Sequence, residues 1–175
     1  MNGVIVYKTK YGSTKKYAQW LKESTGFDMV DADKAKIDEV AKYDIIIFGG
    51  GIYAGGIAGI AFLKKNIVRL QGKKIVAFCC GASPYDAEFM RQLKERNMSG
   101  ELSGIPLFYC RGCCDISTMH FADKTLCKML VKAVSKKAPQ DREVWEAALV
   151  DASGKACDWT DKEYIVPIMK ECEIA

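Results

Sequence analysis

The chain has 175 residues, of which 49% are hydrophobic and 27% are charged, a size and balance typical of one domain with a single core, so we expect one domain over residues 1–175. Its net charge of +4 comes without a basic run interleaved with aromatic residues, which argues against a nucleic-acid partner. Because the N-terminus begins a strand pattern and no segment approaches the roughly 20 apolar residues of a membrane span, we expect a cytoplasmic protein.

Short β-branched apolar runs alternate with helical patterns along the chain. The apolar runs cover residues 4–7, 27–30, 44–48, 75–80 and 105–110. Apolar residues at three- and four-residue spacing predict helices near residues 17–21, 37–40, 60–70, 89–93, 119–137 and 160–172. Strands that are separated by helices pair in parallel through right-handed crossovers. The sequence therefore predicts an α/β fold with a doubly wound, five-stranded parallel sheet, whose ligands bind beyond the carboxyl ends of the strands.

The turn after the first run leads directly into a helix and reads Thr9-Lys10-Tyr11-Gly12-Ser13-Thr14. Free N–H groups at a helix N-terminus, together with hydroxyl side chains, suit a phosphate dianion. The turn lacks the lysine-serine ending of a nucleotide P-loop and the spaced glycines of a dinucleotide fingerprint, which favours a monophosphate. The alternative is that Ser13 only caps the helix.

The turn after the third run holds a glycine cluster around one aromatic residue. It reads Gly49-Gly50-Gly51-Ile52-Tyr53-Ala54-Gly55-Gly56-Ile57. Glycines allow the backbone to approach a flat ligand, and an aromatic ring can cover one face of it. Tyr53 is thus the candidate stacking residue, or else an exposed tyrosine in a loop whose glycines serve only the turn.

These two turns resemble the FMN-binding loops of the flavodoxin superfamily. The Ile52-Tyr53-Ala54-Gly55 turn, Gly112, Asp115, the helix with Asp123-Lys124, and Asp158-Trp159 are closest to the menaquinone-dependent protoporphyrinogen oxidase branch. The resemblance implies FMN as cofactor and a flavodoxin-like strand order of 2-1-3-4-5. The cofactor-binding residues that it implies are Thr9, Lys10, Tyr11, Gly12, Ser13 and Thr14 for the phosphate loop, Gly51, Ile52, Tyr53, Ala54 and Gly55 along the isoalloxazine, and Gly81, Ala82, Ser83 and Tyr85 on its other side.

Two departures from that branch argue against protoporphyrinogen as the substrate. The long basic insertion of the oxidase after the fourth strand is replaced by a modest loop and one helix over residues 81–104. A cysteine pair, Cys113-Cys114, stands where the branch favours a glycine-arginine turn.

The chain has eight cysteines, which a reducing cytosol keeps as free thiols. Cys110, Cys113 and Cys114, with Cys79 and Cys80 one strand away, allow three readings: metal or iron-sulfur ligands, a thiol pair linked to a flavin, or small apolar core residues. Cys79 and Cys80 must point to opposite faces of their strand, so at most one can join a cluster. No metal site is predicted. The one histidine, His120, either faces a flavin as a proton donor or, as is more common for a lone histidine at a helix start, is structural.

Charge separates the possible functions. Electron-shuttling flavodoxins tend to be strongly acidic, whereas this chain is slightly basic, which favours an FMN-dependent oxidoreductase with a quinone or a partner protein as acceptor. The alternatives are a non-enzymatic FMN electron carrier and a flavin-free protein that binds a partner. The lysine-rich helix over residues 119–137 predicts either contact with an anionic membrane surface or an ordinary helix that covers the sheet.

Overall fold

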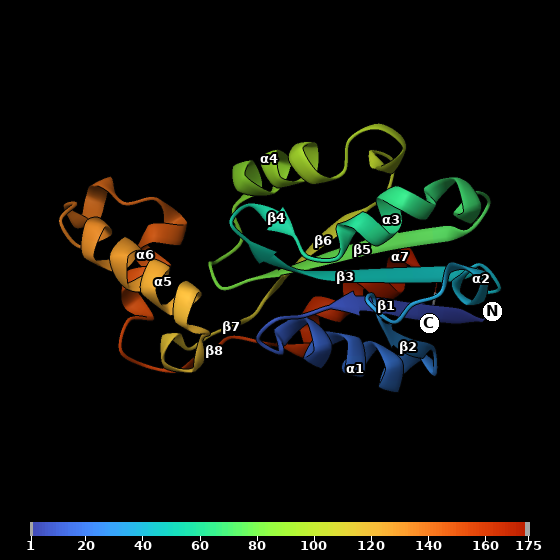
Figure 1. The fold of residues 1–175 in the computed structure, drawn as a ribbon, viewed down its shortest axis with the longest axis horizontal. Helices are drawn as coiled ribbons and strands as arrows, with labels where there is room; N and C mark the ends of the chain where they lie inside the picture. The colour runs from blue at the N-terminus through green and yellow to red at the C-terminus, as the bar shows by residue number, and fades with distance from the viewer. Residues whose placement is uncertain (1, 174–175) are drawn as a thin grey trace.

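A computed structural model describes residues 2–173 and has a layered α/β fold (Figure 1). The strands are β1 (Gly3–Lys8), β2 (Asp28–Asp31), β3 (Ile45–Tyr53), β4 (Gly56–Ile57), β5 (Lys74–Gly81), β6 (Leu107–Arg111), β7 (Cys113–Cys114) and β8 (Cys157–Asp158). The α-helices are α1 (Ser13–Thr25), α2 (Ile37–Val40), α3 (Ile60–Asn66), α4 (Ala87–Asn97), α5 (Phe121–Val134), α6 (Val144–Asp151) and α7 (Val166–Glu171). The short 3-10 helices are η1 (Ile67–Leu70), η2 (Gly100–Leu102), η3 (Ile116–Thr118), η4 (Pro139–Asp141) and η5 (Lys162–Ile165).

Five parallel strands form the central sheet in the order β2-β1-β3-β5-β6. Numbered along the chain, this is the predicted order 2-1-3-4-5, so the predicted fold is confirmed. The short strand β4 adds an antiparallel partner to the end of β3. A separate two-stranded antiparallel ribbon joins β7 and β8. Strand β4 and the ribbon were not predicted, because two-residue strands carry no hydrophobic alternation.

Each face of the sheet has its own apolar core and its own helices. On one face, Tyr17 and Leu21 of α1 and Ile168 of α7 pack over the sheet. On the other face, Leu63 of α3 and Leu93 of α4 do the same. The two faces thus have the doubly wound arrangement that strictly alternating strands and helices require.

Strand β3 runs five residues beyond the predicted end at Phe48. The glycines that were read as the start of a turn instead continue the strand, since a Cβ atom at Gly49 would lie 2.2 Å from the ring of Phe78 on β5. The missing side chain makes room for a large neighbouring ring in the core. The turn itself begins later, at Ala54 and Gly55, which carries Tyr53 to the carboxyl edge of the sheet.

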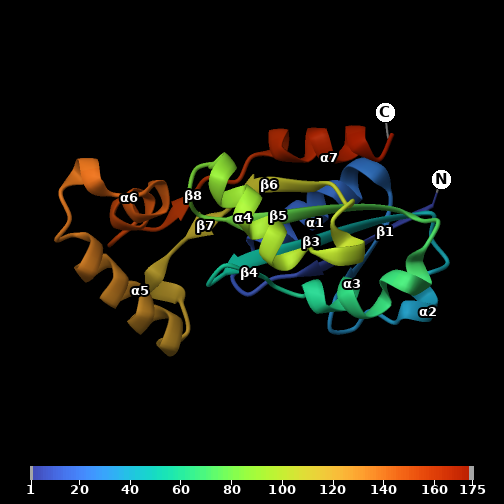
Figure 2. The ribbon, with the colours of Figure 1, turned by 90° about the horizontal axis from the view of Figure 1, so that it is seen from above.

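Residues 113–158, here called the outer unit, lie beyond the carboxyl ends of the strands (Figures 1 and 2). The outer unit contains β7, α5, α6 and β8 and packs around Cys114, Ile116 and Ala152. The predicted lysine-rich helix is α5, and the reading in which it covers the sheet is wrong, because α5 packs in this outer core and α7 covers the sheet instead. Helical periodicity reveals an apolar face but not the partner of that face.

Candidate functional site

Residues 9–14 connect β1 to α1 at the carboxyl edge of the sheet and are called the phosphate loop. Gly12 is the N-cap of α1 in a left-handed conformation, with φ of 99°, and no side chain caps the helix. The N–H of Lys16 donates to the Gly12 carbonyl at 3.0 Å, so the preceding N–H groups of the first turn lack acceptors within the helix. Such N–H groups form an anion site at the positive end of the helix dipole.

Two hydroxyl side chains complete this site. Ser13 does not cap the helix, as one reading proposed, because its Oγ accepts a hydrogen bond from the N–H of Cys113 at 3.0 Å. A serine hydroxyl that accepts in this way keeps its own hydrogen for a ligand. Thr14 is only 1% exposed, although threonine is usually a surface residue, and stands one residue further along α1. Both side chains are therefore held in place, Ser13 by its hydrogen bond and Thr14 by burial.

Tyr53 links the glycine-rich turn to the phosphate loop. Its hydroxyl accepts a hydrogen bond from the N–H of Lys10 at 3.0 Å, and its ring meets that of Tyr11 edge to face at 6.1 Å. Burial raises the pKa of Tyr53, which keeps the phenol protonated at neutral pH. The beginning of the turn is thus held against the loop, with Ile52 in the strand and Ala54 and Gly55 at the tip. Gly51 lies beneath the Tyr53 ring, where a Cβ atom would come within 2.7 Å of the hydroxyl.

The third predicted segment, residues 81–85, ends β5 beside the other two. Its carbonyl groups are occupied: Gly81 accepts from the N–H of Gly112 at 2.8 Å, Ala82 from Nε of Arg111 at 3.1 Å, and Ser83 from the hydroxyl of Tyr109 at 2.5 Å. Tyr85 differs from the rest, since it is 62% exposed and touches only the edge of the Tyr109 ring among the aromatic residues. The segment offers a fixed backbone wall with an exposed aromatic residue at its end.

The outer unit supplies groups that sequence reasoning did not place in the site. Asp123, in the first turn of α5, pairs with the Lys10 ammonium and accepts a hydrogen bond from the Tyr11 hydroxyl. The Lys10 ammonium, and then the Tyr11 hydroxyl, hold the pKa of Asp123 below its usual value. His120 lies beside the Tyr11 ring, with centroids 5.8 Å apart. Asp123 was named as part of the family resemblance. Its contacts with Lys10 and Tyr11 could not be predicted, because more than a hundred residues separate them from Asp123 in the sequence.

The three turns and the N-terminus of α1 lie at the same edge of a doubly wound sheet. A comparison of the chain with known proteins shows which family has this arrangement. Residues 4–142 match the family described as Flavodoxin domain. The chain belongs to the flavodoxin-domain family. This membership confirms the predicted superfamily and supports FMN as the cofactor of the chain.

Relatives of this flavodoxin domain are distant. An uncharacterised protein of Methanocaldococcus jannaschii is 27% identical over 114 residues, which cover 64% of this chain and 76% of that protein. The flavodoxin, WrbA-like protein from Agrobacterium tumefaciens has 17% identity and a TM-score of 0.50, covering 86% of this chain and 96% of its own. A flavoprotein from Lactobacillus acidophilus in complex with FMN has 15% identity and a TM-score of 0.43, covering 63% and 91% of the two chains. At 17% identity, the likeness to the Agrobacterium protein concerns the fold alone.

The cysteines of the flavodoxin domain do not gather into one cluster. Cys79 lies in the core of one sheet face, and Cys80 and Cys110 lie in the core of the other, which confirms the predicted opposite orientation. Burial raises the pKa of Cys79 and of Cys110, so these thiols stay protonated. Cys114 packs in the outer unit instead. Within residues 2–173, no group of three or more His, Cys, Asp or Glu side chains is placed to hold a metal ion.

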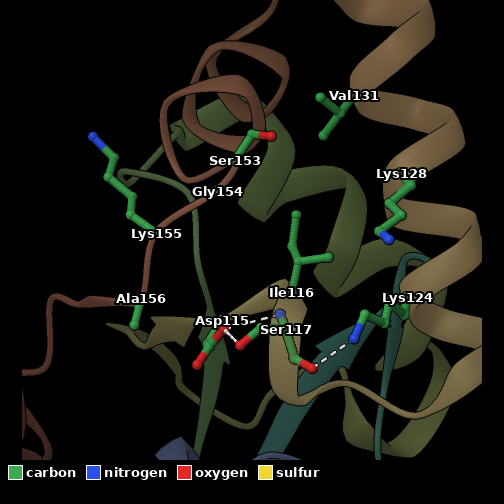
Figure 3. Close-up of a pocket in the computed structure, with 10 residues that line it drawn as sticks. All are labelled: Asp115, Ile116, Ser117, Lys124, Lys128, Val131, Ser153, Gly154, Lys155 and Ala156. Carbon is green, nitrogen blue, oxygen red and sulfur yellow. Dashed lines mark hydrogen bonds between the residues drawn. The ribbon is translucent and has the colours of Figure 1, made fainter.

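Two cavities lie near the outer unit rather than in the phosphate loop. One of about 600 Å³ is lined by residues of the 83–92 segment and by residues 142–145, which include Trp145. The other, of about 520 Å³, opens between α5 and residues 153–156 (Figure 3). Lys124 and Lys128 line its α5 side, where the Lys124 ammonium donates to the Ser117 carbonyl at 2.8 Å. Ser83, one of the predicted cofactor-binding residues, lines the first cavity, and no residue of the phosphate loop lines either of the two.

Proposed function

We propose that the protein binds one FMN at the carboxyl edge of the sheet and acts as an oxidoreductase that transfers electrons or hydride. The observation that carries this proposal is the N-terminus of α1, where left-handed Gly12 leaves the first-turn N–H groups without helical acceptors. Nothing within 4 Å of Gly12 fills the place of a side chain, so the approach to these groups is open on that side. The residues present therefore fit a phosphate monoester.

Different residues of the chain would bind the phosphate and the isoalloxazine of FMN. The N–H groups of the first turn and the hydroxyls of Ser13 and Thr14 would bind the phosphate, and the Lys10 ammonium adds attraction. The Tyr53 ring would cover one face of the isoalloxazine, with residues 81–85 on the other side. FMN supplies the hydride and electron chemistry when bound, and the protein sets its orientation and polarity. Because the loops carry few acid or base side chains, direct hydride or electron transfer is the step that they favour.

The first experiment removes the two hydroxyls. FMN is titrated into the metal-free, reduced full chain and into the Ser13→Ala/Thr14→Ala variant, with binding followed by quenching of flavin fluorescence. Loss of hydrogen bonds to a charged phosphate costs about 1.5–3 kcal/mol each, so we expect FMN affinity to fall by at least tenfold. The matched control is Ser24→Ala, at an exposed position near the other end of the same helix. Equal affinity of all three proteins would overturn this phosphate site.

A quinone is our proposed acceptor, because α5 offers a surface that fits an anionic membrane, where quinones dissolve. Three large apolar side chains of α5 face solvent: Phe121 is 86% exposed, Met129 60% and Leu126 48%. Lys124, Lys128 and Lys132 recur at four-residue spacing and form a row next to Phe121 and Met129 on the same helix. Apolar residues bordered by lysines are the pattern of a helix that rests in a lipid headgroup layer.

Within residues 2–173, no helix meets the length and apolarity needed to cross a bilayer.

The second experiment tests this acceptor proposal. The purified protein is floated with vesicles of phosphatidylglycerol or of phosphatidylcholine, and NADH-driven reduction of a soluble menaquinone analogue is assayed separately. We expect flotation with the anionic vesicles only, and its loss in Phe121→Ser/Met129→Ser. No flotation would contradict the membrane contact. FMN binding without quinone reduction would instead favour the non-enzymatic electron carrier, while a chain that binds no FMN would favour the flavin-free alternative.

A further inference from the structure

The two ends of the outer unit are joined to the rest of the chain by the β7–β8 ribbon. In this ribbon Cys113 pairs with Asp158 and Cys114 pairs with Cys157. The Cys113 thiol donates to Oδ1 of Asp158 at 3.2 Å, so this first pair points to one side of the ribbon. Side chains alternate along a strand, and Cys114 and Cys157 accordingly both pack on the other side, in the core of the outer unit. Two thiols therefore face each other at the neck of the unit.

The spacing of such a pair suits a covalent bond. Directly opposed residues of antiparallel strands have Cα atoms about 4.5–5.5 Å apart, inside the range of about 4.4–6.8 Å that disulfides require. We propose that Cys114 and Cys157 form a reversible disulfide that locks the neck of the outer unit. This inference concerns the fold of the chain and does not depend on whether FMN binds.

The two thiols differ in access, which assigns their order of reaction. Cys157 is half-buried, whereas Cys114 is only 5% exposed. Burial, and then the nearby Cys127 and Cys157, raise the pKa of Cys114 to about 11, which makes it the poorer first nucleophile. Cys157 is thus the thiol that meets an external oxidant, and Cys114 is the thiol that resolves the product.

A low-molecular-weight disulfide such as glutathione disulfide is the oxidant of this reaction. The Cys157 thiolate attacks one glutathione sulfur, forms a mixed disulfide and releases one glutathione thiol. The Cys114 thiolate then attacks the Cys157 sulfur and releases the second glutathione. The cysteine pair loses two electrons and two protons, and glutathione disulfide gains them as two thiols.

The proposed disulfide lies next to the phosphate loop, so its formation bears on the contacts of that loop. The N–H of Cys113, next to Cys114, donates to Ser13 at 3.0 Å. The carboxylate of Asp158, next to Cys157, pairs with the Lys16 ammonium on α1 at 2.8 Å. A disulfide between Cys114 and Cys157 therefore holds in place the two neighbouring residues, Cys113 and Asp158, that contact the first turn of α1.

The test follows thiols and linked peptides in the full reduced chain after incubation with glutathione disulfide. We expect the free thiols to fall from the eight of the sequence to six, with dithiothreitol restoring all eight. A non-reduced tryptic digest should link peptide 112–124 to peptide 156–162. Because peptide 112–124 also contains Cys113, the digest is repeated with Cys113→Ser, which should keep the link. Digestion of the outer unit by limited proteolysis should slow several-fold on oxidation.

Controls distinguish this pair from the other cysteines. Cys157→Ser and Cys114→Ser should each abolish the linked peptide and the proteolytic protection, while Cys127→Ser, which changes a thiol in the same core, should leave both intact. The folding of each variant is checked by its far-ultraviolet circular dichroism. A thiol count that stays at eight, or a bond that joins Cys80 to Cys110 or involves Cys127 in the wild-type chain, would overturn the proposal. Mixed disulfides on Cys157 that never close would overturn it as well.

Discussion

Asp123 controls the charge that a phosphate meets at the phosphate loop. Its carboxylate pairs with the Lys10 ammonium and accepts from the Tyr11 hydroxyl, so it reduces the attraction that Lys10 offers an incoming dianion. In bulk water, a unit charge about 4 Å away changes the interaction by about 1 kcal/mol, or about fivefold, and this value suits a partly exposed carboxylate. We therefore expect Asp123→Asn to tighten FMN binding about fivefold at low salt, measured by fluorescence titration, with the gain shrinking at high salt. Weaker binding would mean that the carboxylate orders the loop more than it repels phosphate.

Tyr53 combines a ring and a hydroxyl, and two substitutions separate their roles. Tyr53→Ala removes the surface that would cover the isoalloxazine, and we expect FMN affinity to fall about tenfold, the upper range for one aromatic contact. Tyr53→Phe removes only the acceptor of the Lys10 N–H, and affinity should stay within about threefold of wild type. Isothermal titration of both variants with FMN gives the comparison. If the phenylalanine variant loses as much as the alanine variant, the hydrogen bond and not the ring is decisive.

The position of the phosphate loop at the start of a helix was predictable because its signals are local, while the roles of its residues stay predictions. Ser13 and Thr14 stand at a helix start, and the N-terminal exposure of N–H groups follows from helix geometry alone. The partner of Ser13 was not predictable, because the N–H of Cys113 reaches it only when the ribbon folds back. The contact of Asp123 with Lys10 is of the same kind.

At the scale of elements, the close approach of the ribbon to α1 depends on Gly112. A Cβ atom there would lie 2.9 Å from Ser13 Oγ and 3.0 Å from Ser13 Cβ. Gly112→Ala should push the ribbon off the phosphate loop, weaken FMN binding and destabilise the fold by about 1–3 kcal/mol, as overpacking does. Thermal unfolding and FMN titration measure the two effects. Gly104→Ala, where nothing lies within 4 Å, is the control and should change neither.

The ribbon is also tied to α1 by the pair between Asp158 and Lys16. The Lys16 ammonium, and then the Thr160 hydroxyl, hold the pKa of Asp158 well below its ordinary value of 3.8. A depressed pKa contributes stability above the ordinary value, and this contribution is lost as pH falls through the folded-state pKa. We expect Asp158→Asn to lower stability at pH 7 by no more than about 1 kcal/mol, because the pair is largely exposed. In urea unfolding the difference from wild type should shrink below pH 3.8; a constant difference would contradict this linkage.

The long strands and sheet-covering helices were predictable, since their apolar runs and helical spacing are strong local signals. The extension of β3 was missed because Gly49 is a turn residue by composition, and only the Phe78 ring beside it explains a glycine in a strand. Helix α6 was missed because its apolar residues are not confined to one face. The ribbon was missed because its pairing is defined by contacts between segments far apart in the sequence.

At the scale of the whole molecule, the outer unit lies beyond the carboxyl edge of the central sheet (Figure 2). The division of the chain into one domain over residues 1–175 stays a prediction, as does its cytoplasmic location. The outer unit has its own core and meets the phosphate loop through Asp123 and Cys113. This arrangement places the outer unit in direct contact with the phosphate loop.

The most direct test of the proposed cofactor compares FMN with riboflavin, which has the same ring system without the phosphate. Each is titrated into the purified, flavin-free chain, and flavin fluorescence is followed to saturation. We expect one FMN per chain to bind, with riboflavin at least tenfold weaker, because the α1 N-terminus and the Ser13 and Thr14 hydroxyls recognise the phosphate. Equal affinities for the two flavins, or no binding of FMN, would contradict the account.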